Sequence, residues 1–146
     1  MDTLRKESMA MSMIVDFFKA VAGICRTRPL DSDLWEVTDE KARVSVERVP
    51  ELNDPGGAVY LAGKGLPGRV LIVARNDGGY VCAANRCTHA SRRLDPIPGK
   101  ETLRCCSVSH STFDYEGNKL SGPARKPLKI YPWKLEGKEL VIDVSG

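Results

Sequence analysis

The sequence has few histidines and aromatic residues, little net charge and no long uncharged apolar run, and each shortage excludes a class of protein. Aromatic residues make up 6% of the 146 residues and the net charge is +3, which argues against nucleic-acid binding. Residues 9–25 are the most apolar stretch, but Asp16 and Lys19 make it too short and too charged to span a bilayer or act as a signal peptide. The chain also lacks a phosphate loop, a dinucleotide fingerprint and a Ser-His-Asp set. We therefore expect a cytoplasmic protein that binds no nucleic acid.

The apolar stretch at residues 9–25 predicts a helix, because Phe17 and Val21 fall on one helical face and no proline interrupts it. Such a helix packs on the domain or on a partner protein, or else contacts a membrane surface. Its polar face lacks a strong Lys/Arg stripe, which favours packing over membrane contact. We divide the chain into an N-terminal helical segment at 1–30, a polar connector at 31–41 and a domain at 42–146.

The chain from Ala42 onward has short apolar segments with turn signals at close intervals, which is typical of an all-β domain. The first strand is expected over residues 43–48. Residues 69–75 form a continuous apolar run rich in β-branched side chains, which predicts a central strand. The following Asn-Asp-Gly-Gly at 76–79 predicts a hairpin turn with positive φ, and a last hairpin is expected around Glu136-Gly137.

Two short stretches, Cys-Thr-His at 87–89 and Cys-Cys-Ser-Val-Ser-His at 105–110, hold three of the five cysteines and both histidines. Thiolates and imidazoles delivered by a pair of loops indicate a metal site by composition alone. An odd number of cysteines, with Cys105 and Cys106 adjacent, does not suggest a disulfide framework. A reducing compartment with metal-bound thiolates fits better. Cys25 is expected to be a small core residue of the N-terminal helix.

The two stretches, separated by 15 residues, resemble the cluster-binding loops of the Rieske family of iron–sulfur proteins. Phe113-Asp114, Gly117 and the loop from Leu120 to Ala124, followed by Pro127-Leu128, agree with the family pattern. The resemblance implies an all-β fold, a Rieske-like antiparallel β-sandwich with a small cluster-binding subdomain, here with the N-terminal helix added. It also implies a [2Fe–2S] cluster held by two cysteines and two histidines.

Three of the four ligands expected from this resemblance are Cys87, His89 and His110, since the chain has no other histidine. The fourth ligand is Cys105 or Cys106, because the second loop departs from the family spacing of Cys-x-x-His.

The two possible cysteines of the second loop follow from two ways of aligning it. Counting back from Phe113-Asp114 selects Cys106 and puts Ser109 where the family has its histidine. The alternation of Leu103-Arg-Cys places Cys105 at the end of a strand and makes the loop one residue longer. We favour Cys105, because strand register fixes side-chain direction whereas loops tolerate insertions.

The donor set also suits other assignments. Zinc is the main alternative for two cysteines and two histidines, but Cys-x-His is tighter than the usual spacing of zinc fingers. The resemblance implies an electron-transfer protein, either a ferredoxin-like carrier or the small subunit of an oxidoreductase. The chain has no room for a catalytic domain, so it is not an oxygenase by itself. The alternative is an interaction or docking module on a Rieske scaffold with a degenerate or zinc-bound site.

Residues around the two loops indicate what kind of redox partner the protein has and what reduction potential the cluster has. The resemblance places a loop-to-loop disulfide of some family members at Arg92, so that bridge is not expected. Ser111 matches a serine that hydrogen-bonds toward the cluster, whereas Phe113 replaces a tyrosine and lacks its hydroxyl, which implies a low or middle potential. Basic side chains in or beside both loops form a possible rim that steers an acidic redox partner: Arg86, Arg92, Arg93, Arg125 and Lys126.

Overall fold

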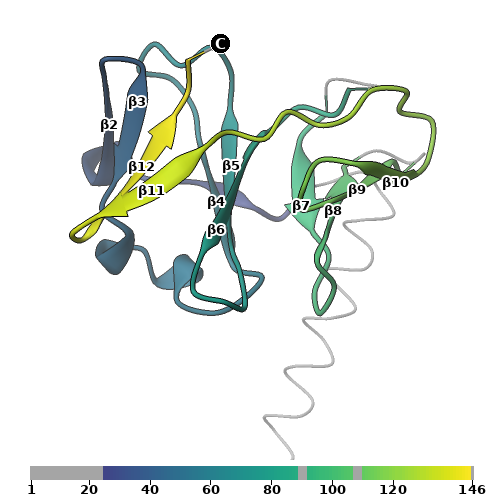
Figure 1. The fold of residues 1–146 in the computed structure, drawn as a ribbon, viewed down its shortest axis with the longest axis horizontal. Coiled ribbons are helices and arrows are strands. Elements are labelled where there is room, and N and C mark those ends of the chain that lie inside the picture. Colours follow the sequence, from purple (N-terminus) through teal and green to yellow (C-terminus); the bar gives the residue numbers. More distant parts are fainter. Residues whose placement is uncertain (1–24, 89–91, 107–109, 146) are drawn as a thin grey trace, which may run out of the picture.

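The computed structural model describes residues 25–88, 92–106 and 110–145, so the helix predicted at 9–25 lies outside the described residues apart from Cys25. The described chain folds into three four-stranded sheets stacked as layers (Figure 1). No helix within these residues is long and apolar enough to cross a membrane. The layers confirm the all-β fold predicted from the sequence.

The middle sheet contains the predicted central strand. This strand, β5, is buried at every position and lies between two antiparallel neighbours. The Asn-Asp-Gly-Gly turn follows it, with Gly78 at φ 83°, as predicted. The edge strand β1 pairs in parallel with β4, whereas the other pairs of the sheet are antiparallel. In spatial order the sheet comprises β1 (Arg28–Pro29), β4 (Ala58–Leu61), β5 (Val70–Ala74) and β6 (Tyr80–Ala84).

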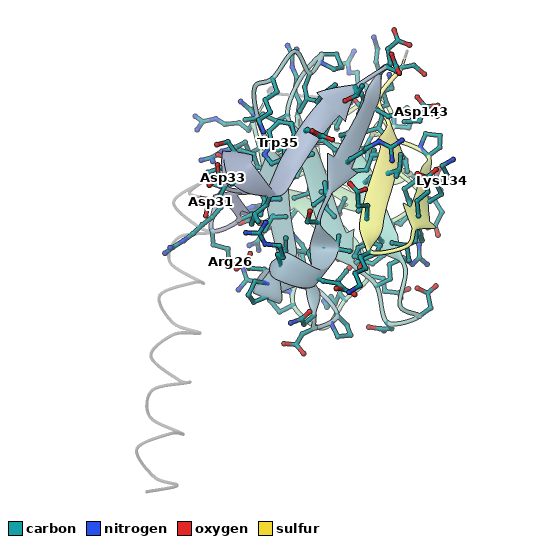
Figure 2. All side chains as sticks on the ribbon, turned by 90° about the vertical axis from the view of Figure 1, so that its left-hand side faces the viewer. Arg26, Asp31, Asp33, Trp35, Lys134 and Asp143 are labelled. Atoms are coloured by element: carbon teal, nitrogen blue, oxygen red, sulfur yellow. A yellow bond between two sulfur atoms is a disulfide. The ribbon has the colours of Figure 1, made fainter. Side chains whose placement is uncertain are left out.

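The second sheet packs on one face of the middle sheet and completes the sandwich (Figures 1 and 2). Figure 2 shows Trp35 near one edge of this sheet and Lys134 near the other. The last hairpin turns at Gly137, as predicted, with φ 59°. In spatial order the sheet comprises β11 (Trp133–Glu136), β12 (Glu139–Asp143), β3 (Lys41–Val44) and β2 (Trp35–Thr38).

Two of the predicted segments differ in the structure. Residues 31–41, predicted as a polar connector, contain the 3-10 helix η1 (Ser32–Leu34) and the strand β2, which pairs with β3. The strand predicted over 43–48 ends at Val44, and the chain then forms two 3-10 helices, because Val46 and Leu52 turn inward to the core instead of continuing the ladder. These helices are η2 (Val46–Arg48) and η3 (Pro50–Leu52).

The third sheet forms a small subdomain that packs on the opposite face of the middle sheet, at the right of Figure 1. Both stretches predicted from the sequence to bind a metal adjoin its strands: the first precedes β7 and the second begins at the end of β8. In spatial order this sheet comprises β10 (Lys119–Ser121), β9 (Thr112–Asp114), β8 (Thr102–Cys105) and β7 (Leu94–Pro96).

The middle sheet supplies side chains to two separate cores. Along β5, Val70 and Ile72 belong to the core of the sandwich, whereas Leu71 and Val73 belong to the core under the third sheet. Side chains of a strand alternate between faces, so a strand covered on both sides must be apolar throughout. This arrangement explains the uninterrupted apolar run in the sequence.

Candidate metal centre

The first ligand stretch is a loop closed at its base by hydrogen bonds. The buried side chain of Asn85 accepts a bond from the Leu94 N–H through Oδ1 at 2.7 Å, joining the end of β6 to the start of β7. Inside the loop, the Cys87 N–H donates to the carbonyl of Arg92 at 2.7 Å. These two hydrogen bonds fix the position of the backbone around Cys87.

The second ligand stretch leaves the end of β8 and lies beside the first. Cys105 is the last residue of β8, and its N–H donates to the carbonyl of Ser111 at 2.8 Å, which closes the loop. The Cys106 N–H donates to the carbonyl of Arg93 at 2.8 Å. Because Arg93 ends the first loop, this bond holds the two loops side by side.

A third segment, residues 121–127, covers both ligand loops. The Thr88 hydroxyl donates to the carbonyl of Lys126 at 2.8 Å, and the Ala124 N–H donates to the Ser111 hydroxyl at 3.0 Å. Gly122 approaches the backbone of the second loop so closely that a Cβ there would lie 2.4 Å from the Cα of Ser111. The segment is therefore closely fitted to the ligand loops.

Three members of the predicted ligand set, Cys87, Cys105 and His110, lie among the described residues. Cys87 and Cys105 are 1% and 0% exposed and belong to the same buried cluster. Neither is in a disulfide. His110 is half-buried, at φ 50°, and its Nδ1 is buried without a hydrogen-bond partner among the described residues. His89 lies outside the described residues.

Cys106 and Cys25 are joined in a disulfide, with their Cα atoms 5.4 Å apart. The prediction of a chain without disulfides is therefore wrong, and so is the prediction that Cys25 is a core residue of a helix. The two sulfurs and a carboxylate oxygen of Asp95 lie within 4.8 Å of one another. A disulfide sulfur is no longer a thiolate, so the bridged pair does not offer the ligands of a metal site. Neither the pairing nor the role of Asp95 was predicted from the sequence.

Cys82, whose direction the sequence leaves open, belongs to the core of the sandwich, whereas Cys87 and Cys105 belong to the core on the other face of the middle sheet. Burial raises the pKa of the Cys82 thiol far above its ordinary value, because the thiolate has no solvation there. This cysteine is therefore an inert core residue.

Four of the five basic residues of the predicted rim are exposed, namely Arg86, Arg92, Arg125 and Lys126. The fifth, Arg93, is half-buried, and its guanidinium donates to the Tyr60 hydroxyl at 2.9 Å and stacks on that ring. Arg93 therefore ties the first loop to the middle sheet rather than presenting its charge outward.

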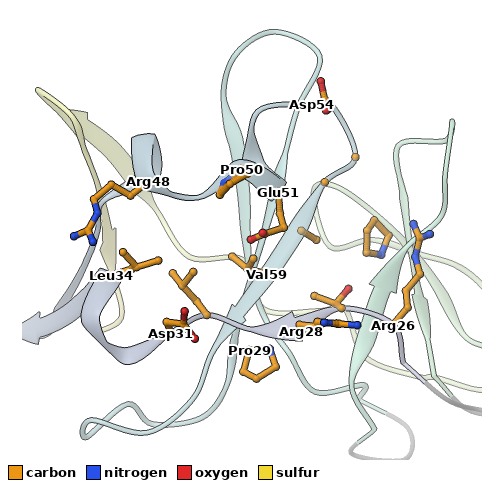
Figure 3. Close-up of a pocket in the computed structure, with 16 residues that line it drawn as sticks. Arg26, Arg28, Pro29, Asp31, Leu34, Arg48, Pro50, Glu51, Asp54 and Val59 are labelled. Atoms are coloured by element: carbon orange, nitrogen blue, oxygen red, sulfur yellow. The ribbon is translucent and has the colours of Figure 1, made fainter.

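One groove, of about 750 Å³, is lined by none of the predicted ligands. It lies between the segment 26–31 and the 3-10 helices, and Figure 3 shows Arg28 and Pro29 on one side of it and Pro50 and Glu51 on the other. This groove is therefore separate from the described ligand candidates Cys87, Cys105 and His110.

The thiols of Cys87 and Cys105 and the imidazole of His110 are the types of ligand that a Rieske [2Fe–2S] cluster uses. Two buried thiols suit one iron, and a buried imidazole nitrogen without a partner is a costly arrangement unless a bond to a further group satisfies it. Iron bound at His110 Nδ1 would supply that bond.

Comparisons with known proteins identify the family of the chain. A family model described as the Rieske [2Fe-2S] domain matches residues 42–132. The ferredoxin component of the naphthalene 1,2-dioxygenase system of Pseudomonas aeruginosa is 31% identical over 81 residues, which are 53% of this chain and 76% of that protein. The same component from Pseudomonas putida is 31% identical over 81 residues, with the same coverage.

Solved structures show the same fold. The ferredoxin of carbazole 1,9a-dioxygenase from Nocardioides aromaticivorans IC177 superposes with a TM-score of 0.55 at 23% identity, covering 67% of this chain and 96% of that one. A chain of the complex of reduced oxygenase and oxidized ferredoxin in carbazole 1,9a-dioxygenase superposes with a TM-score of 0.53 at 16% identity, covering 62% of this chain and 82% of the other. The chain therefore belongs to the Rieske [2Fe–2S] domain family, and it is an electron-transfer protein of the ferredoxin type whose cofactor is a [2Fe–2S] cluster.

Proposed function

We propose that this protein carries single electrons to a partner enzyme, with its cluster held by Cys87, His89, Cys105 and His110. When bound, the [2Fe–2S] cluster supplies one-electron redox chemistry. Two thiolates on one iron and two neutral imidazoles on the other make the reduced form less unfavourable than four thiolates do. The protein's own residues hold the loops, bury the thiols and keep the covering segment in place.

The observation that carries this ligand set is the bridge between Cys25 and Cys106. It commits one of the two adjacent cysteines to another sulfur and leaves Cys105, wholly buried at the end of β8, as the cysteine that faces the core shared with Cys87. The buried, unsatisfied Nδ1 of His110 supports iron binding at the other end of the same loop.

One spectrum of the purified protein tests the proposal. A brown protein with about two iron atoms per chain and a rhombic low-temperature EPR signal on reduction is the expected result. A colourless protein that contains zinc would instead make the chain an interaction module on a Rieske scaffold.

The redox partner we propose is an oxygenase component with an acidic docking surface. The relative from Pseudomonas aeruginosa is named as part of a dioxygenase system, and the exposed Arg125 and Lys126 lie in the segment that covers the cluster loops. Leu120, which is 53% exposed, directly precedes that segment in sequence and offers an apolar contact. A small apolar patch with surrounding charges is typical of transient protein interfaces.

Salt is expected to slow electron transfer to such a partner. Reversing two charges with Arg125→Glu and Lys126→Glu should lower the second-order rate to an oxygenase component by about tenfold at low ionic strength, and added salt should remove most of the difference. Lys138→Glu is the matched control, because Lys138 lies in the last hairpin, away from the third sheet (Figure 1). Stopped-flow kinetics measures both, and rates that do not depend on salt would contradict an acidic docking surface.

The midpoint potential is expected in the lower or middle part of the Rieske range of roughly −150 to +300 mV. Phe113 is fully buried in the cluster of residues that contains Cys105, and it has no hydroxyl to donate toward sulfur. Ser111 receives the Ala124 N–H and keeps its own proton to donate, which leaves one such bond available. Redox titration followed by circular dichroism gives the potential, and a value near the top of the range would contradict this prediction.

Location in the cytoplasm and contact of residues 9–25 with a partner or a membrane stay predictions. Cell fractionation of the full chain tests its location. Sedimentation of the full chain with lipid vesicles tests whether it contacts a membrane.

A further inference from the structure

The segment from Cys25 to Leu30, called the strap here, connects the third sheet to the middle sheet. At its far end the strap forms β1, which pairs in parallel with β4, and the Leu30 N–H donates to the carbonyl of Tyr60 at 2.8 Å. Figure 3 shows Arg28 and Pro29 on this part of the strap and Arg26 beyond them, toward the third sheet.

The near end of the strap is bound by a buried carboxylate. Asp95, in β7, is 5% exposed and accepts the backbone N–H groups of Arg26 at 2.8 Å and Thr27 at 3.1 Å, one on each oxygen. A buried carboxylate that receives two backbone donors is well satisfied and fixes the backbone it contacts. The strap is therefore positioned before any covalent bond is considered.

The disulfide attaches this positioned strap to the second ligand loop. Cys106 is 7% exposed and follows Cys105 directly, whereas Cys25 is half-buried and thus the more accessible sulfur. The described hydrogen bonds from the backbone N–H groups at the start of the loop go to Ser111 and Arg93, so the bridge is a third restraint on the same short stretch.

We propose that the Cys25–Cys106 bridge is a thiol–disulfide exchange site, and that its reduction by a dithiol loosens the second ligand loop and speeds release of the cluster. A thiolate of the dithiol attacks Sγ of Cys25, the S–S bond breaks, and the Cys106 sulfur leaves and takes up a proton. The second thiol of the reductant then attacks its own sulfur in the mixed disulfide and releases Cys25. Two electrons and two protons pass to the protein, and the dithiol becomes a disulfide.

The effect on the cluster rests on the proposed ligand set, whereas the effect on the loop does not. Cutting the bridge leaves the Asp95 contacts and the loop's backbone bonds in place, so the loop opens more often without unfolding. We expect reduction to increase both amide hydrogen exchange in the second loop and the rate of iron loss to a chelator by about tenfold.

The experiment uses the full chain, oxidised and then treated with dithiothreitol. Mass spectrometry of the denatured, alkylated protein should find a cross-linked pair of peptides containing Cys25 and Cys106, which dithiothreitol separates. Cys25→Ser should show the fast exchange and fast iron loss without reductant, and dithiothreitol should add nothing further. Cys82→Ala, which removes a thiol of the other core, should respond to reductant as the native chain does.

Two results would overturn the proposal: five alkylated cysteines in the oxidised protein, or equal loop exchange in the bridged and reduced forms. If the purified chain bound no iron, that result would contradict the proposed ligand set and not the proposal about the bridge. In that case the cross-link and the amide exchange of the iron-free protein still decide whether the bridge restrains the loop.

Discussion

Replacing Cys105 with alanine is expected to abolish iron binding, whereas replacing Cys106 is expected to leave the visible spectrum intact. Cys105 is fully buried and belongs to the same core cluster as Cys87, and loss of the proposed ligand there would leave an iron with an open position. Cys106 is bonded to Cys25, so its removal costs a bridge and not a ligand. Iron content and absorbance of the two purified variants measure the difference.

The matched control for this pair is Cys25→Ala, which breaks the same bridge without touching the ligand loop. Cys106→Ala and Cys25→Ala should therefore bind the same amount of iron and lose it at the same raised rate. If Cys105→Ala kept the cluster and Cys106→Ala lost it, the proposed ligand set would be wrong.

Gly122→Ala is expected to destabilise the protein by about 3 kcal/mol and to impair cluster binding. Gly122 has φ +92°, and an added Cβ would lie 2.4 Å from the Ser111 Cα and 2.9 Å from the His110 carbonyl oxygen. Both neighbours are backbone atoms of the second ligand loop, so the loop itself has to move. The melting temperature should fall by about 10 °C, as measured by circular dichroism.

Gly78→Ala separates the clash at Gly122 from ordinary backbone strain. Gly78 also has positive φ, at +83°, but nothing lies within 4 Å of the position of its added Cβ. Its replacement should cost about 1 kcal/mol and leave iron content unchanged. Equal losses of stability in the two variants would show that the close approach of the covering segment is unimportant.

The sequence was sufficient to predict the elements whose signal is local. The run at residues 69–75 became β5 because a strand buried on both faces has to be apolar throughout. The predicted turn at Gly78 formed because glycine accepts positive φ without strain. The two Cys/His stretches also have a local signal, because cysteine and histidine are rare in the chain and their spacing indicates a metal site. The individual ligands stay a prediction.

The hairpin of β2 and β3 was missed because its turn has no glycine or asparagine. Asp39 and Glu40 both adopt positive φ, at 53° and 60°, in the two-residue connection between the strands. Such turns are usually recognised by Asn-Gly or Asp-Gly. An acidic pair in a polar stretch predicts a connector instead. The strand β2 is recognised only from its pairing with β3 in the structure.

The disulfide could not be predicted because it depends on the tertiary fold. Cys25 and Cys106 are 81 residues apart in sequence, and connectivity of cysteines does not follow from spacing. The Asp95 carboxylate holds the strap, and with it Cys25, near the loop by accepting the backbone N–H groups of residues 26 and 27. Any residue except proline has such an N–H group, so these contacts cannot be recognised from the residue types at the two positions.

The two-sided burial of β5 has a consequence for how the protein denatures. Val70 and Ile72 on one face and Leu71 and Val73 on the other are consecutive residues of one strand, so neither core can lose this strand without the other losing it too. The sandwich and the cluster-binding layer are thus halves of a single cooperative unit, although they are drawn as separate layers. Bleaching of the chromophore and collapse of the β-sheet signal should then fall on the same denaturation curve.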